Sequence, residues 1–101
     1  MNIWEDPAVQ SGILDYLEQK QLLASFTSMG GVAIREGAQC HCSLPEHVDK
    51  QVIVLCQFDF DELVPFGAAG DQRLRQQGQV HVRLDEAGKV VDAWLCRPGS
   101  C

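Results

Sequence analysis

QVIVLCQFDF, residues 51–60, is the stretch of this sequence that decides the fold. Apolar side chains stand at every second position of it, namely Val52, Val54, Cys56, Phe58 and Phe60. Ile53 and Leu55 add apolar side chains at the alternate positions. A period of two is the pattern of a β-strand, and apolar residues at both parities are typical of a strand covered on both sides. We therefore expect a central strand, with Val54, Cys56 and Phe58 nearly inaccessible to solvent.

The preceding stretch, residues 32–44, alternates in the same way and predicts the first strand. Its apolar positions are Val32, Ile34, Ala38, Cys40, Cys42 and Leu44. Glu36 and Gly37 interrupt the alternation and indicate a bulge, or a tight turn that divides the stretch into two short strands. Residues 43–49 are interpreted as a polar hairpin loop, with a short helical turn as the alternative. Strands one and two are thus expected within residues 32–60.

The sequence after the central strand contains a second pair of extended runs. Residues 80–84 and 89–95 flank a turn that contains Gly88, and they predict a β-hairpin over residues 79–96. Residues 61–78 carry Pro65, Gly67 and Gly70 and are interpreted as a mixed loop and short helix, with residues 71–77 as the helical part. Residues 97–101 are expected to fray.

The N-terminal region has the pattern of a helix over residues 6–24. Asp6 is a good N-cap and Pro7 loses no hydrogen bond at the first helical position. The expected apolar face consists of Val9, Ile13, Tyr16, Leu17, Leu23 and Ala24. Together these elements predict a single α+β domain, residues 1–101, in which the N-terminal helix packs on an antiparallel sheet of about four strands. Its expected order is α-β-β-(short α or loop)-β-β, in two layers.

Charge and hydropathy limit the classes of partner. The formal net charge is −6, from 14 acidic and 8 basic residues, so binding to a phosphate backbone is disfavoured. The longest strongly apolar run, residues 52–56, is far shorter than the roughly 20 residues that cross a bilayer. The N-terminus lacks the basic and apolar regions of a secretory signal. We therefore expect a cytoplasmic protein that binds neither nucleic acid nor membrane.

The cysteines are the residues most suggestive of chemistry. Cys40 and Cys42 flank His41, and thiolates and imidazole are preferred zinc ligands. On a strand, however, His41 points away from both cysteines, and the sequence has no Cys-x-x-Cys pair. Cys40 and Cys42 are able to meet Cys56 across an adjacent strand, so a thiol-based metal-binding or redox protein using these three residues is the alternative function. The favoured interpretation is that they are reduced, buried core residues.

Signatures of catalysis are weak. None of the three histidines has a diagnostic spacing from a cysteine, and neither a phosphate-binding glycine loop nor a nucleophile elbow is present. We expect no cofactor, and we consider an enzyme less consistent with the sequence than a binding protein.

A partner-binding surface is predicted in the stretch that follows residue 58. Acidic residues there adjoin apolar ones, and the candidate set is Asp59, Asp61, Glu62, Val64 and Phe66. Exposed apolar groups supply affinity and charges supply steering; alternatively, the apolar residues fold back as a lid on the core. We predict a small, soluble, non-enzymatic protein-interaction module, such as an adaptor, inhibitor or chaperone-like binder. Its partner is expected to be another protein with a basic surface, and a homo-oligomer is compatible with the sequence.

Overall fold

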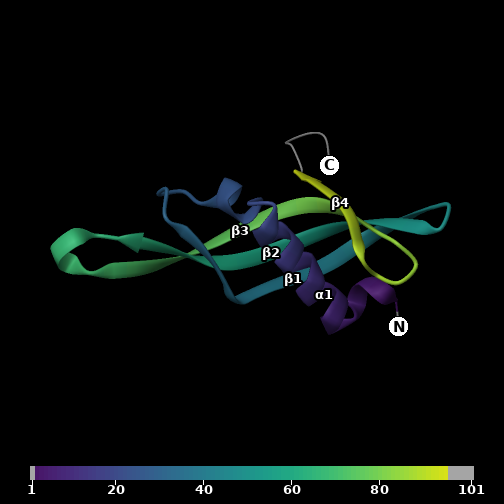
Figure 1. The fold of residues 1–101 in the computed structure, drawn as a ribbon, viewed down its shortest axis with the longest axis horizontal. Coiled ribbons are helices and arrows are strands. Elements are labelled where there is room, and N and C mark those ends of the chain that lie inside the picture. The colour runs from purple at the N-terminus through teal and green to yellow at the C-terminus, as the bar shows by residue number, and fades with distance from the viewer. Residues whose placement is uncertain (1, 96–101) are drawn as a thin grey trace.

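The computed structural model describes residues 2–95 and consists of one α-helix, three 3-10 helices and four strands. The N-terminal part contains η1 (Ile3–Glu5), α1 (Pro7–Gln19) and η2 (Leu23–Phe26). The strands are β1 (Val32–Val48), β2 (Gln51–Pro65), β3 (Asp71–Leu84) and β4 (Val90–Leu95), with η3 (Gly67–Ala69) between β2 and β3. They form one antiparallel sheet in the order β1-β2-β3-β4, with α1 packed across it (Figure 1). The predicted α+β fold class is confirmed.

Local capping and backbone conformation set the two ends of helix α1. The Asp6 carboxylate accepts a hydrogen bond from the Ala8 amide at 2.9 Å, and Pro7 occupies the first turn. The helix was expected to reach residue 24 but ends at Gln19, because Gln21 takes a left-handed conformation with φ of 59°. Leu23 is nevertheless buried, since the chain re-enters the core through η2.

The sheet has one covered face and one open face. The helix face carries the register row Cys42, Cys56 and Val80, which is buried against the helix, whereas the open face carries the row His41, Gln57 and Gln79. Val54, Cys56 and Phe58 are nearly inaccessible, as predicted. The expectation that β2 is covered on both sides is wrong, because Ile53 and Leu55 lie on the open face and are only partly buried.

Strand β1 also differs from the prediction. It continues through residues 43–48, where a loop was expected, and its register with β2 shifts between Ile34 and Gln39. Before the shift Val32 pairs with the open-face residue Leu63, whereas after it Cys40 pairs with the helix-face residue Phe58. The predicted bulge is therefore present, and it moves the apolar positions of β1 from one face to the other.

The largest correction concerns residues 61–78, which were predicted to be mixed loop and short helix. They form instead the far ends of β2 and β3 and the tight connection between them. The turn residues that suggested irregular structure are confined to residues 65–70, and Gly67 and Gly70 have φ of 60° and 83°. The hairpin predicted at residues 79–96 is observed up to Leu95, and the tail 97–101 lies outside the described residues.

The sheet extends well beyond the helix. A 13-residue helix is about 20 Å long, whereas the longest dimension of the molecule is 54 Å. The β2–β3 hairpin consequently projects past α1 on one side, as Figure 1 shows. In residues 2–95 no helix is long and apolar enough to span a membrane.

Candidate partner-binding surface

The outer edge of β3 is the part of the sheet where a long run of backbone groups has no neighbouring strand in the described chain. β3 pairs with β2 along its whole length, from Asp71 to Leu84, without a register shift. On its other side, β4 pairs only with the stretch from Val80 to Leu84. No strand of the described chain pairs with the outer side of residues 71–79, which we call the free edge of β3. In an antiparallel strand, alternate residues direct their N–H and C=O groups to each side, so this edge presents unpaired backbone groups.

The outer edge of β1, at one side of the sheet, is interrupted. Its register with β2 shifts twice, and Pro45 lacks a donor within the second shift. Gly37 and Leu44 have left-handed backbones, with φ of 78° and 50°. Bulges and proline are the features by which proteins prevent strand addition at an edge. Compared with the edge of β1, the free edge of β3 is therefore better suited to receiving another strand, and the outer edge of β4, at the opposite side of the sheet, is only six residues long.

An ion-pair network fixes the charged side chains beside the free edge. Arg75 Nη2 lies 2.6 Å from Asp59 Oδ1, and Arg75 Nη1 lies 3.0 Å from Asp61 Oδ1. Arg73 Nη1 contacts the second oxygen of Asp61 at 3.3 Å. The hydrogen bond from Arg75 is the main reason that the pKa of Asp61 lies below its usual range. Both guanidinium groups are thereby drawn across the open face toward β2, away from the edge.

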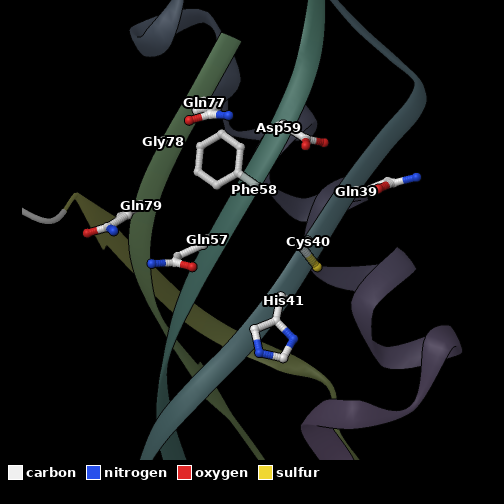
Figure 2. Close-up of a pocket in the computed structure, with 9 residues that line it drawn as sticks. All are labelled: Gln39, Cys40, His41, Gln57, Phe58, Asp59, Gln77, Gly78 and Gln79. Carbon is white, nitrogen blue, oxygen red and sulfur yellow. The ribbon is translucent and has the colours of Figure 1, made fainter. Parts of the chain in front are cut away.

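A shallow polar hollow of about 570 Å³ adjoins the same edge on the open face. Figure 2 shows the nine residues that line it, three from each of three neighbouring strands. Cys40, Phe58 and Gly78 form a helix-face register row, and the six open-face residues are Gln39 and His41 of β1, Gln57 and Asp59 of β2, and Gln77 and Gln79 of β3. Four of the six are glutamines, whose amides both donate and accept hydrogen bonds. The hollow therefore suits polar groups of a bound segment, and Gln77 and Gln79 join it to the free edge.

Glu62 is a buried anchor and not part of a surface. Its carboxylate accepts hydrogen bonds from the amides of Ser28 (2.9 Å), Met29 (3.1 Å) and Gly31 (2.7 Å), and from Gln76 Nε2 at 2.8 Å. Desolvation alone would raise the pKa of Glu62, but these donors outweigh it and hold the pKa below its usual range. The side chain ties the connection between α1 and β1 to the projecting hairpin.

The residues predicted to bind a partner are thus divided between two faces. Asp59 and Asp61 lie on the open face in the ion-pair network, whereas Glu62 and Val64 point to the helix face and are buried. Phe66 is exposed at the tip of the hairpin. Of the predicted surface, the acidic Glu62 and the apolar Val64 are therefore inaccessible to a partner, while Asp59 adjoins the hollow.

A second group on the open face surrounds Trp94 of β4. Its ring is stacked on His81 with ring centroids 5.6 Å apart, and the Arg83 guanidinium lies 5.8 Å from the ring centroid. Trp94 stays partly exposed, and Leu55 lies in the same register row on the other side of His81. This group around Trp94 and the polar hollow occupy successive parts of one face.

The three predicted metal-ligating cysteines lie on the helix face. Cys42 is opposite Cys56, with the Sγ atoms 2.9 Å apart, and Cys40 is two residues earlier on β1. Residues 2–95 contain no group of three or more His, Cys, Asp or Glu side chains arranged to hold a metal ion. His41, on the opposite face, does not join these thiols.

Arg73, Arg75, Gln77 and Gln79 were not predicted as site residues. They alternate with Leu74, Gln76 and Gly78, of which only Leu74 is apolar with a large side chain, so the sequence lacks the polar–apolar alternation that would have indicated a strand. Comparisons of the chain with protein-family models, curated proteins and solved structures found no match.

Proposed function

We propose that this chain is a small non-enzymatic protein-interaction module that takes up an extended segment of a partner protein along the free edge of β3. One observation carries the proposal: residues 71–79 continue a regular strand whose outer side is unpaired within the described chain. A segment added there forms backbone hydrogen bonds, which supply affinity independent of sequence. This mode of binding requires no catalytic group.

The side chains beside the edge support strand addition and give it selectivity. Charged residues at an edge normally oppose pairing, but Arg73 and Arg75 are engaged by Asp59 and Asp61 on the neighbouring strand. Alternate side chains of an added strand face the open side, next to Gln77 and Gln79 and the polar hollow. The segment that fits is therefore extended and carries polar side chains at alternate positions.

Electrostatics favours a basic partner. The net charge of the chain is −6, and the hairpin between residues 59 and 77 contains four carboxylates and two guanidinium groups. Because the two arginines are neutralised by Asp59 and Asp61, the remaining carboxylates leave an excess of negative charge. We therefore propose that basic residues flank the polar segment and accelerate its association at low ionic strength.

Substitution of lysine at two positions of the free edge of β3 tests the proposal. A partner is first captured from the native host and identified by mass spectrometry, and its affinity for the purified chain is measured. Gln77→Lys with Gln79→Lys introduces the type of residue that discourages edge pairing. Loss of one or two backbone hydrogen bonds, each about 1 kcal/mol, weakens binding roughly tenfold.

Ala8→Lys with Gln19→Lys is the matched control, because it adds the same charge at exposed positions of α1. We expect the control to bind with close to parental affinity and both variants to melt near the parental temperature. Equal affinities of the edge variant and the control would refute strand addition at β3, even if the captured protein is a true partner.

A further inference from the structure

Two buried thiols face each other across β1 and β2. Cys42 is the direct register partner of Cys56, and their Sγ atoms lie 2.9 Å apart. Both side chains are buried, with exposed fractions of 4% and 0%. Both are free cysteines, so this contact is between two reduced thiols.

We propose that Cys42 and Cys56 are a site of reversible oxidation, at which hydrogen peroxide converts the two thiols into a cross-strand disulfide. Directly opposite residues of antiparallel strands have Cα atoms about 4.5–5.5 Å apart, within the range that disulfides span. The sulfur atoms already lie on one face and in contact, so closure needs no change of register. This inference does not depend on the proposed binding function.

The reaction balances with a peroxide as the only oxidant. The peroxide oxidises one thiol to a sulfenic acid, and one water is released. The sulfur of the second thiol then attacks the sulfenic sulfur, the S–S bond forms, and a second water leaves. Two thiols and one hydrogen peroxide thus give one disulfide and two waters, and an added dithiol reverses the change.

The surroundings of Cys42 slow its oxidation. The pKa of Cys42 is raised to about 12: a hydrogen bond with Cys40 lowers it, but the hydrogen bond with Cys56 and burial together outweigh that effect. The thiol is thus protonated near neutral pH, and thiolates are the reactive form. Direct oxidation of Cys42 by peroxide is therefore slow near neutral pH.

Cys40 is the natural competitor for the disulfide. It lies two residues from Cys42 on the same strand, is less buried, and donates a hydrogen bond from Sγ to the Gln10 carbonyl at 3.5 Å. Its register partner is Phe58 and not a cysteine. The geometry therefore assigns the disulfide to Cys42 and leaves Cys40 as a free thiol.

Peptide mapping tests the assignment. A full-length chain with Cys96→Ser and Cys101→Ser is treated with hydrogen peroxide while folded, alkylated after denaturation, and cleaved by trypsin. Arg35, Lys50 and Arg73 bound the two informative peptides, residues 36–50 and 51–73. We expect these peptides to be linked, with the alkyl group on Cys40, and to separate on treatment with dithiothreitol.

Two variants distinguish the thiols. The link is expected to persist in Cys40→Ser and to be absent in Cys42→Ala. If Cys42→Ala does not fold, fragmentation of the linked parental peptide shows whether Cys40 or Cys42 carries the alkyl group. A link that uses Cys40, or folded parental protein that forms no link under conditions that oxidise free cysteine, would overturn the proposal.

Discussion

The β2–β3 ladder is regular along its entire length, yet its two halves are stabilised in different ways. In the proximal half, Val52–Phe58 pairs with Gly78–Leu84, lies against the hydrophobic core under α1, and borders β4. In the distal half, Asp59–Pro65 pairs with Asp71–Gln77, β1 pairs with β2 as far as Leu63, and Phe60 is the one member of the hydrophobic core. The Glu62 carboxylate also joins this half to the connection between α1 and β1, through the amides of Ser28, Met29 and Gly31. A hairpin can thus extend beyond the helix that covers the core when a buried polar anchor supports it, and the extension leaves one edge unpaired.

The largest loss of stability is expected in the proximal half, when Phe58 is replaced. Its ring is buried, lies edge-to-face against Phe26 with centroids 5.0 Å apart, and is adjacent to Gly78. Phe58→Ala should lower the free energy of unfolding by about 3–5 kcal/mol, because it leaves a cavity as well as losing apolar burial. Urea denaturation measures the change. A midpoint equal to that of the parent would show that this half does not depend on the core.

A smaller loss of stability, which depends on pH, is expected in the distal half when Glu62 is replaced. Its pKa in the folded chain is below the ordinary value of 4.5, so the unfolded chain takes up the proton first as the pH falls. The stabilisation is therefore fully present above about pH 4.5 and is lost as the pH drops through the folded-state pKa. Glu62→Gln should lower the melting temperature at pH 7 by less than Phe58→Ala and reduce the difference between pH 7 and pH 3.

Thermal melts of both chains across this pH range measure the effect, and Asp15→Asn is the control, since Asp15 is an exposed carboxylate in an ion pair with Arg35. An acid dependence that is the same in Glu62→Gln and in the parent would contradict the role of Glu62 as the anchor of the distal half.

The sequence predicted the proximal half much better than the distal half, for a physical reason. Alternating apolar residues at 52–60 and at 80–84 identify strands because burial imposes that pattern. In the distal half, a carboxylate replaces an apolar residue at the buried position 62, and its donors come from Ser28, Met29 and Gly31, more than thirty residues earlier. Contacts so distant in sequence leave no local pattern. Glu62 therefore looked like surface charge, and the strand around it looked like a loop.

The free edge was missed for the same reason. Identifying it requires the lengths of β3 and β4 and the register between them, which only the assembled sheet provides. The cysteines were more accessible to prediction, because the alternation in residues 38–44 and in residues 52–60 placed Cys40, Cys42 and Cys56 on faces that an antiparallel pairing brings together. Which of the first two lies opposite Cys56 depends on the register, and the bulge in β1 sets that register.

Backbone hydrogen exchange of the free edge tests the central claim most directly. In the free chain, the amides of residues 71–79 that point away from β2 should exchange rapidly, while those of residues 80–84, enclosed between β2 and β4, should be protected. On binding a captured partner, the outward amides of residues 71–79 should become protected, and the amides of β1 should be unchanged. Protection that appears at β1 instead, with no change at residues 71–79, would contradict the account.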